Sequence, residues 1–506
     1  MSVTTEATTV TTIKHFINGT ETAGDGTGTQ PVYNPATGEV TANLSLASDA
    51  DLQAAVAAAR TAADAWGDTS LAKRTAVLFK FRELLAASTD ELARIVTSEH
   101  GKVVSDAAGE IGRGLEVVEY ACGISQSLKG EYSDQVSTGI DVYSFRQPLG
   151  VVAGITPFNF PVMVPLWMAP VAIAAGNAFI LKPSERDPSA AVFLARLFKE
   201  AGLPDGVFQV LHGGKETVDG LLRHPDIDGI SFVGSTPIAK YVHETATAHG
   251  KRVQALGGAK NHAVVMPDAD MEVAADHLTA AAFGSAGQRC MAISVAVAVG
   301  GAADILVDKL VTRAHDIKVS NGLDDGADMG PVITPASKTR IEKIVGEAQE
   351  AGAALIVDGR DLVVADHENG FFVGPTIIDK VQREMTAYTE EIFGPVLAIV
   401  RVDTLAEAIE IVNANPYGNG TAIFTSNGAD ARTYTRRVHV GMVGVNVPLP
   451  VPVAWHSFGG WKNSLFGEHH IYGPDGVRFY TRGKAVTQRW PEHKELSNAS
   501  FAFPSN

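Results

Sequence analysis

The chain has 506 residues, of which 45% are hydrophobic, and its 57 acidic and 41 basic side chains give a net charge of −16. This apolar content supports a sizeable core and excludes a disordered or fibrous chain. The negative charge disfavours nucleic acid or an anionic membrane as a partner. Two cysteines cannot form a disulfide framework, so a reducing compartment, the cytoplasm, is expected.

Strands over residues 14–18 and 38–42 are predicted to open the fold. Residues 1–12, which precede them, are rich in threonine and lack the apolar core of a secretory signal. Ser48 and Asp51 have the spacing of a capping box ahead of an alanine-rich run, which predicts a helix start. Further helices are expected over 71–99 and 104–128, and then a hairpin that includes 137–147.

Residues 148–181 contain no charged side chain, and their length alone would allow a membrane span. Pro157, Pro161, Pro165 and Pro170 each remove a helical hydrogen-bond donor from that span. We therefore favour a buried strand, a structured loop, a buried helix and a second buried strand.

From residue 151 onward, short β-branched strands alternate with helices, which is the pattern of a parallel sheet covered on both faces. The second half repeats this pattern without repeating the sequence. We therefore predict an α/β protein with two parallel-sheet domains. The strands are expected at 151–155, 178–181, 208–211, 229–232, 295–299, 355–357 and 396–400, and the helices at 189–201, 237–249, 303–317, 338–351 and 404–413.

Two strand ends are candidate sites for a nucleotide, although the Rossmann and P-loop motifs are absent from the sequence. Gly234 and Ser235 lie between a strand and a helix, and the free N–H groups of such a helix start bind anions. A plain turn gives the same pattern. Lys182 and Glu185 follow another strand, where ligands of open parallel sheets collect, and they suit ribose hydroxyls. A solvated loop is the alternative.

Cys290 is a candidate nucleophile. Glycines in the run before it let a ligand approach the backbone, and the positive charge of Arg289 favours the thiolate. The run also falls between a helix and a strand of the second domain, at an expected interdomain cleft. An inert buried thiol is the alternative, and it is our interpretation of Cys122. The 15 histidines include no metal-ligand motif, so no metal is expected.

Several motifs in register resemble the aldehyde dehydrogenase superfamily over nearly the whole chain. The resemblance is closest to the CoA-acylating branch that oxidises methylmalonate semialdehyde and malonate semialdehyde. The motifs are Pro157-Phe-Asn-Phe-Pro161, Lys182-Pro-Ser-Glu185, Phe232-Val-Gly-Ser235, Gly258-Ala-Lys-Asn-His262, Gly287-Gln-Arg-Cys-Met-Ala292 and Glu391-Ile-Phe-Gly-Pro395.

This resemblance implies that Cys290 attacks the aldehyde and that Asn159 and the Cys290 backbone N–H stabilise the oxyanion. Hydride then passes to NAD, which leaves a thioester on the sulfur. A carboxylate beside the ribose favours NAD over NADP. The residues implied to hold NAD are Thr156, Phe158, Lys182, Glu185, Arg186, Gly234, Ser235, Gly257, Glu391 and Phe393.

The sequence departs from the superfamily where a glutamate normally activates the hydrolytic water. The run Gln254-Ala-Leu-Gly-Gly258 has Ala255 in place of that glutamate, so transfer of the acyl group to CoA is favoured over hydrolysis. The implied products are propionyl-CoA or acetyl-CoA with loss of CO₂. A hydrolytic NAD-dependent enzyme that releases a free acid is the alternative. A non-enzymatic relative is disfavoured by the intact Cys290 and Asn159.

Arg113 and Arg289 match the two arginines that grip the substrate carboxylate in this branch. A helix-surface salt bridge is the alternative for Arg113.

The resemblance also implies a subunit of three parts that assembles as a homotetramer, a dimer of dimers. These parts are an NAD-binding domain (1–131 and 148–258), a catalytic domain (259–466), and an oligomerisation hairpin with a C-terminal strand (132–147 and 481–506).

Overall fold

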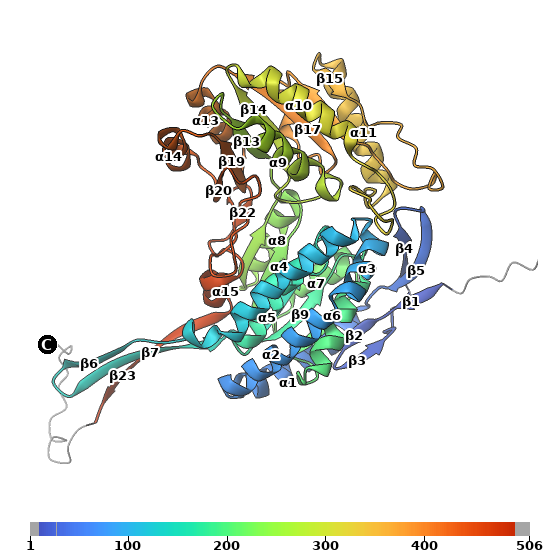
Figure 1. Cartoon of the computed structure of the whole chain (residues 1–506). Helices are drawn as coiled ribbons and strands as arrows, with labels where there is room; N and C mark the ends of the chain where they lie inside the picture. Colours follow the sequence, from blue (N-terminus) through green and yellow to red (C-terminus); the bar gives the residue numbers. More distant parts are fainter. Residues whose placement is uncertain (1–9, 27, 491–506) are drawn as a thin grey trace, which may run out of the picture.

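Two sheets of mainly parallel strands organise the computed structural model, which describes residues 10–26 and 28–490 (Figure 1). Most of the predicted N-terminal segment and the tail after residue 490 lie outside these residues. The larger sheet has eight strands, with parallel apolar strands at its centre and short antiparallel strands at its edges. In sheet order they are β22 (Leu465–Phe466), β12 (Arg252–Leu256), β11 (Gly229–Val233), β8 (Val151–Ile155), β9 (Ala178–Lys182), β10 (Phe208–Val210), β2 (His15–Ile17) and β3 (Thr20–Thr22).

Helices cover both faces of this sheet, because alternate side chains of its strands point to opposite sides. In β8, Val151 and Ala153 join one apolar cluster and Val152 joins the other. The first face is covered by α1 (Asp49–Gly67), α7 (Lys215–Arg223) and α8 (Thr236–Ala248). The second face is covered by α2 (Leu71–Ala87), α3 (Thr89–His100), α4 (Val104–Cys122), a short 3₁₀ turn (Ile124–Gln126), α5 (Met163–Ala174), α6 (Ser189–Glu200) and α15 (Gly473–Phe479).

Two local predictions in this half are confirmed. Ser48 caps α1, with its Oγ accepting from the Asp51 N–H at 3.1 Å and the Asp51 carboxylate accepting from the Ser48 N–H at 2.8 Å. The uncharged stretch 148–181 forms β8, a loop, the buried helix α5 and β9, as expected. Among the described helices, none combines the length and apolar character that a membrane span requires.

The second sheet has seven strands, which run parallel except at one edge. The predicted fold class, two parallel-sheet α/β units, is confirmed. In sheet order the strands are β15 (Ala354–Val357), β16 (Thr376–Asp379), β17 (Val396–Val402), β14 (Ile293–Val299), β13 (Asn261–Val265), β19 (Gly420–Phe424) and β20 (Met442–Val445). The helices of this half are α9 (Met271–Phe283), α10 (Ala302–Asp316), α11 (Pro335–Glu350), α12 (Thr386–Thr389), α13 (Leu405–Ala414) and α14 (Gly428–Arg437).

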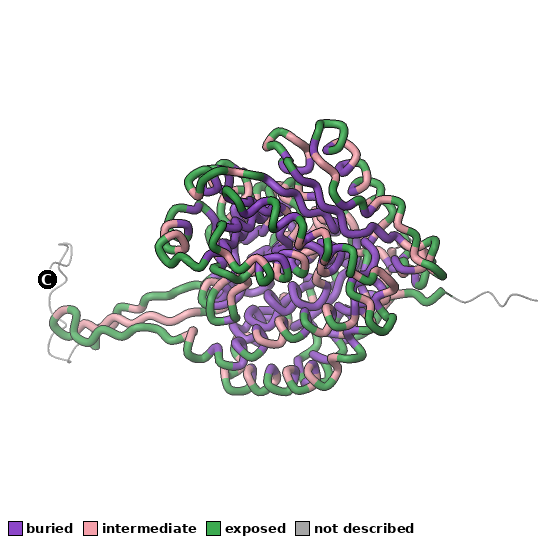
Figure 2. The backbone as a smooth tube through the Cα atoms, turned by 45° about the horizontal axis from the view of Figure 1, so that its top comes forward, coloured by how far each residue is buried: buried purple, intermediate pink, exposed green. Residues whose placement is uncertain are grey.

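A three-stranded arm projects from the body of the molecule and stays largely uncovered along its length (Figures 1 and 2). It consists of β6 (Tyr132–Ser137), β7 (Ile140–Pro148) and β23 (Thr481–Arg489), all antiparallel. The predicted hairpin is therefore present, and the last strand pairs with it. Two smaller sheets consist of β1 (Thr11–Ile13), β4 (Thr29–Asn34) and β5 (Glu39–Ser45), and of β18 (Tyr417–Gly418) and β21 (Trp461–Lys462).

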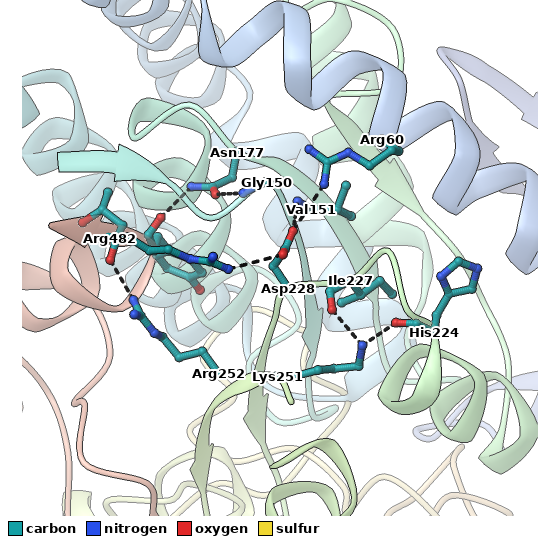
Figure 3. Close-up of polar contacts among 12 residues, drawn as sticks. Arg60, Gly150, Val151, Asn177, His224, Ile227, Asp228, Lys251, Arg252 and Arg482 are labelled. Atoms are coloured by element: carbon teal, nitrogen blue, oxygen red, sulfur yellow. Dashed lines mark hydrogen bonds and ion pairs between the residues drawn. The ribbon is translucent and has the colours of Figure 1, made fainter. Parts of the chain in front are cut away.

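Polar contacts tie the base of this arm to the amino ends of the first sheet (Figure 3). Arg252 Nη1 donates to three carbonyl oxygens where α15 ends and β23 begins, those of Arg478 at 3.0 Å, Phe479 at 2.8 Å and Thr481 at 2.7 Å. Asn177 Nδ2 donates to the carbonyl of the intervening residue, Tyr480, at 3.0 Å. The arm is thus anchored at the amino ends of the strands of this sheet, away from their carboxyl ends.

Replacing Arg252 with leucine removes all three of these hydrogen bonds. Because charge-assisted hydrogen bonds contribute about 1.5–3 kcal/mol, the amides of β23 should exchange about tenfold faster or more. Hydrogen–deuterium exchange of peptides covering 481–490 measures this. Arg478→Leu is the control, since that side chain only pairs with Asp475 near the surface. Unchanged protection of β23 in Arg252→Leu would contradict the anchoring role.

Candidate active site

The carboxyl ends of the first sheet face loops that precede strands of the second sheet, and together they enclose a cavity of about 360 Å³. We call it the strand-end cavity. Loops after β8, β11 and β12 form one side, and the loops before β14 and β17 form the other. Its lining residues are Pro157, Phe158, Asn159, Val233, Gly234, Ser235, Gly257, Gly258, Cys290, Arg340, Glu391 and Phe393.

The loop before β14 presents Cys290 through strained backbone. Ser285, Ala286 and Gly287 have φ of 53°, 50° and 68°, a left-handed run that side chains disfavour. A Cβ on Gly287 would lie 2.0 Å from the Gly394 carbonyl oxygen, so this position requires glycine. The Cys290 carbonyl is held by two amide side chains, Asn261 at 2.9 Å and Asn419 at 3.1 Å. The sulfur therefore has a fixed place in the cavity wall.

Burial and a nearby carboxylate govern the electrostatics of Cys290. Burial and the negative charge of Glu391 raise the pKa of the Cys290 thiol to about 12, and the opposing effect of Arg289 is smaller. Arg289 forms an ion pair with Asp106. Arg289 thus lowers the pKa of the Cys290 thiol, as predicted, but burial and Glu391 outweigh it, so the thiol stays protonated in the free protein.

Glu391 and Phe393 form the wall beside the sulfur. Burial raises the pKa of the Glu391 carboxyl to about 7, and the Ala259 N–H, which donates to its Oε1 at 3.0 Å, opposes that rise. Phe393 has a φ of 55° and meets the Phe158 ring edge-on at 5.7 Å. The predicted residues on both sides of the cavity thus converge near Cys290.

Asn159, the predicted oxyanion donor, lines the same cavity as Cys290 and is only 3% exposed. Its backbone carbonyl accepts from Lys102 Nζ at 2.7 Å. The structure therefore brings the predicted catalytic pair into one enclosed space. Sequence patterns did not single out Lys102, because its contact with Asn159 joins positions 57 residues apart.

The predicted cofactor residues fall into two groups. Phe158, Gly234, Ser235, Gly257, Glu391 and Phe393 line the strand-end cavity. The other four, Thr156, Lys182, Glu185 and Arg186, lie beside it, at and beyond the ends of β8 and β9. The Thr156 N–H donates to the Lys182 carbonyl at 3.1 Å, Lys182 pairs with Glu185 at 2.5 Å, and the Arg186 guanidinium lies 4.9 Å from the centre of the Phe158 ring.

A second cavity, of about 490 Å³, also includes Cys290 in its lining. We call it the arginine cavity, because it brings together the two predicted substrate residues, Arg113 and Arg289. Its other lining residues are Asp106, Gly109, Glu110, Phe160, Met163, Trp167, Met291, Leu449 and Val451. Cys290 thus lines both the strand-end cavity and the arginine cavity.

Both arginines are already paired in this structure. Arg113 pairs with Glu116 at 2.9 Å and donates to the carbonyls of Val451 at 3.2 Å and Pro452 at 2.9 Å. Arg289 pairs with Asp106 from one guanidinium nitrogen. The salt bridge that we considered for Arg113 as an alternative therefore exists, and it coexists with a place in the cavity wall.

The side chains of Ala255 and Leu256 pack in the two apolar clusters, and the next residues, Gly257 and Gly258, line the strand-end cavity. In the pairing of β11 with β12, Leu256 lies beside Val233 and Ala255 lies beside Phe232. Val233 lines the strand-end cavity, whereas Ala255 and Phe232 pack in the apolar cluster under α8. Because partners in register point to the same face, Leu256 rather than Ala255 shares the sheet face of Val233. Neither side chain accepts a proton.

No group of three or more His, Cys, Asp or Glu residues within 10–26 and 28–490 is placed to hold a metal ion. The two cavities instead offer a thiol, an amide, three arginines (Arg113, Arg289 and Arg340) and three carboxylates (Asp106, Glu110 and Glu391). These groups suit nucleophilic attack on a carbonyl and stabilisation of the resulting oxyanion.

Comparison with known proteins identifies the family of this chain. Residues 22–486 match the model of the aldehyde dehydrogenase family, and the chain belongs to that family. It is 57% identical over 495 residues to the malonate-semialdehyde dehydrogenase of Pseudomonas aeruginosa, covering 98% of this chain and 99% of that protein. It is 48% identical over 497 residues to an acylating, mitochondrial methylmalonate-semialdehyde/malonate-semialdehyde dehydrogenase of Rattus norvegicus, covering 98% and 93%.

A crystal structure of a Sinorhizobium meliloti protein complexed with NAD has a TM-score of 0.95 to this chain at 50% identity, covering 96% of this chain and all of the other. The predicted superfamily is therefore confirmed by both sequence and fold.

Replacing Glu391 with glutamine should lower the pKa of the Cys290 thiol, because it removes the nearby negative charge that opposes thiolate formation. At pH 8, where Glu391 is mainly ionised, alkylation of Cys290 by iodoacetamide should accelerate on the order of tenfold, the effect of one pKa unit. Mass spectrometry of the Cys290 peptide gives the rate. Glu390→Gln is the control, since Glu390 is exposed and pairs with Arg340. Equal rates in both variants would contradict this role of Glu391.

Proposed function

We propose that this chain oxidises malonate semialdehyde or methylmalonate semialdehyde with NAD and transfers the acyl group to CoA, with loss of CO₂. The observation that carries the proposal is the position of Cys290 in the walls of both cavities. One cavity suits a dinucleotide at strand ends, and the other suits a small carboxylate. The names of the relatives from Pseudomonas aeruginosa and Rattus norvegicus support the same substrates and the acylating reaction.

Two features of this chain support NAD at the strand-end cavity. Ser235 precedes α8, and its side chain makes no capping hydrogen bond, so the first N–H groups of that helix are available to a pyrophosphate. Thr156 Oγ1 is buried and has no hydrogen-bond partner among the described residues, which suits a ligand group at that strand end. Lys182 and Glu185 would hold the adenosine ribose, Glu391 the nicotinamide ribose, and Phe158 and Phe393 the adjoining surface.

The chain's own residues then perform the chemistry on the aldehyde. The Cys290 thiolate adds to the carbonyl carbon, and the Asn159 amide and the Cys290 N–H donate to the new oxyanion. NAD, when bound, supplies the hydride acceptor and a positive charge that favours the thiolate. Collapse of the thiohemiacetal leaves a thioester on Cys290. Attack by the CoA thiol transfers the acyl group and restores the Cys290 thiol.

Release of the acyl group depends on whether a base lies near the thioester. Ala255, which takes the place of the family's glutamate, and its neighbour Leu256 are apolar and offer no base, which disfavours activation of water. A CoA thiol needs less activation, because a few per cent of a free thiol is already ionised near neutral pH. Glu391 is the one observation that favours the hydrolytic alternative, since its pKa near 7 suits a base. Against that role, its Oε1 accepts from the Ala259 N–H.

The arginine cavity supports a substrate that carries a carboxylate. Arg113 and Arg289 would each donate to it, in the bidentate geometry that guanidinium groups form with carboxylates. After the aldehyde becomes a thioester, this carboxylate is β to the thioester carbonyl. Its loss as CO₂ then gives acetyl-CoA or propionyl-CoA.

We also propose the division of the subunit inferred from the sequence. The NAD-binding domain comprises 1–131 and 148–258, and the catalytic domain comprises 259–466. The arm of 132–147 with the strand after 481 serves assembly into a homotetramer, which its exposed strand edges support. The unpaired Cys122 and Cys290 suit the cytoplasm, where thiols stay reduced.

Turnover without CoA tests the acylating reaction. With NAD and malonate semialdehyde alone, we expect a burst of about one NADH per active site followed by slow turnover, and sustained turnover once CoA is added. Stopped-flow absorbance at 340 nm measures both phases. Cys290→Ala should abolish the burst. Equal steady-state rates with and without CoA would instead support the hydrolytic enzyme.

Replacing Arg289 with glutamine tests the carboxylate site. Loss of a charge-assisted hydrogen bond, about 1.5–3 kcal/mol, should lower kcat/KM for malonate semialdehyde about 10- to 100-fold. The value for propanal, which has no carboxylate, should stay nearly unchanged. Arg313→Gln, in an ion pair with Asp276 on the outside of α9 and α10, is the control variant. An equal loss for both aldehydes would show that Arg289 does not read the carboxylate.

A further inference from the structure

We infer that Lys102 and Glu110 are positioning residues that hold Asn159 in place as the oxyanion donor. The inference rests on the proposed function in one respect, that Asn159 donates to the oxyanion. Lys102 lies in the turn between α3 and α4, and Glu110 lies one to two turns into α4. Their side chains are 1% and 0% exposed and form an ion pair with Nζ 2.5 Å from Oε2.

The pair grips the Asn159 loop at two points. Lys102 Nζ donates to the Asn159 carbonyl at 2.7 Å and lies 4.5 Å from the centre of the Phe160 ring. Glu110 Oε1 accepts from the N–H groups of Val162 at 2.9 Å and Met163 at 3.1 Å, where α5 begins. The backbone is therefore fixed on both sides of Pro161.

The loop itself has little else to fix its backbone. Pro157 and Pro161 have no N–H to donate, and the residue before α5, Val162, has no side chain that can cap the helix. Glu110 fills that role from another helix, with its negative charge at the positive end of the α5 dipole. Without the pair, the start of α5 and the Asn159 carbonyl would both lose their partners.

The backbone around Lys102 is itself held in place by the segment that precedes α11. A Cβ on Gly322 would lie 2.5 Å from the Lys102 carbonyl oxygen, and one on Gly330 would lie 1.9 Å from the Gly101 carbonyl oxygen. These close backbone contacts leave the turn no room to shift. Lys102 therefore acts from a rigid base, which a positioning role requires.

Stability alone is a poor reason for this arrangement. A buried ion pair gains little over apolar side chains of the same size, since both charges lose their hydration. Here the hydrogen bonds of the two side chains within the described residues all go to the loop that carries Asn159, to the start of α5 or to the partner charge. The ion pair thus fixes the position of the Asn159 loop.

A double-mutant cycle on the rate of the NADH burst tests this inference. Asn159→Ala should slow the burst about 10²–10³-fold, as for loss of an oxyanion-hole donor. Lys102→Met should slow it about tenfold or more in the native background, because displacement of a catalytic group is costly. In the Asn159→Ala background, Lys102→Met should change the rate less than about twofold, since the group that it positions is gone.

Lys251→Met is the matched control. Lys251 is also buried and donates to two backbone carbonyls, those of His224 and Ile227 (Figure 3). It lies at the amino ends of the parallel strands, whereas the strand-end cavity lies at their carboxyl ends. Lys251→Met should leave the burst rate unchanged. Alkylation of Cys290 by iodoacetamide should also stay unchanged in Lys102→Met, because Asn261 and Asn419, not Lys102, hold the backbone of Cys290. If Lys102→Met does not fold, the neutral pair Lys102→Gln with Glu110→Gln replaces it in the cycle.

The inference would be overturned if Lys102→Met slowed the NADH burst equally in the wild-type and Asn159→Ala backgrounds. A wild-type burst rate in the Lys102→Met protein would also overturn it. Loss of Cys290 alkylation together with the burst would indicate general damage and would also overturn it. A wild-type protein without any NADH burst would instead refute the proposed function. The burst precedes acyl release, so the cycle is independent of whether water or CoA accepts the acyl group.

Discussion

One backbone contact fixes the geometry on which the site depends, the approach of Gly287 to the carbonyl of Gly394. One of these loops carries Cys290 and the other carries Glu391, so their contact sets the distance between the thiol and the carboxylate. Ser285, Ala286 and Phe393 hold left-handed backbone conformations to make it possible. Strain of this kind persists only where surrounding contacts over-determine the backbone, and the amides of Asn261 and Asn419 supply such contacts.

This geometry keeps the nucleophile neutral in the free protein. A thiol with a pKa of about 12 is protonated at physiological pH, and a protonated thiol reacts slowly with oxidants and electrophiles. Glu391 contributes to that state as long as it is ionised and uncompensated. A positively charged nicotinamide in the strand-end cavity would reverse the balance of charge. The reactivity of Cys290 would therefore depend on the presence of its cofactor, which suits an enzyme that must not form a thiohemiacetal before a hydride acceptor is bound.

Much of the fold could be predicted because it depends on local patterns. Ser48 and Asp51 are three residues apart, and the apolar run of β8 is contiguous, so neither requires knowledge of a distant partner. The motifs that resemble the family also predicted that Asn159 and Cys290 would act together, and both line one cavity. Resemblance could do this because it carries information on chain packing that spacing lacks.

The rest depends on packing that no local pattern contains. Whether Ala255 or Leu256 shares the sheet face of Val233 follows from the register of β12 against β11, and a shift of one residue reverses the answer. The pair of Arg289 and Asp106 joins positions 183 residues apart, and the thiol pKa depends on burial by several segments. In the sequence, Lys102 looks like an ordinary charged residue between two predicted helices, and Glu110 like one within the second of them. Only their burial against the Asn159 loop distinguishes them.

The charges of the arginine cavity bear on its choice of substrate. Arg113 and Arg289 each have a carboxylate partner, Glu116 and Asp106, so the two cations are largely balanced before a ligand enters. Net attraction therefore cannot explain selection of a carboxylate. A guanidinium has five donors in a planar fork and can serve two carboxylates on different edges, whereas an ammonium acts as a point charge. Selectivity would then reside in the direction of the donors that the existing ion pairs leave unused, which favours arginine over lysine at these positions.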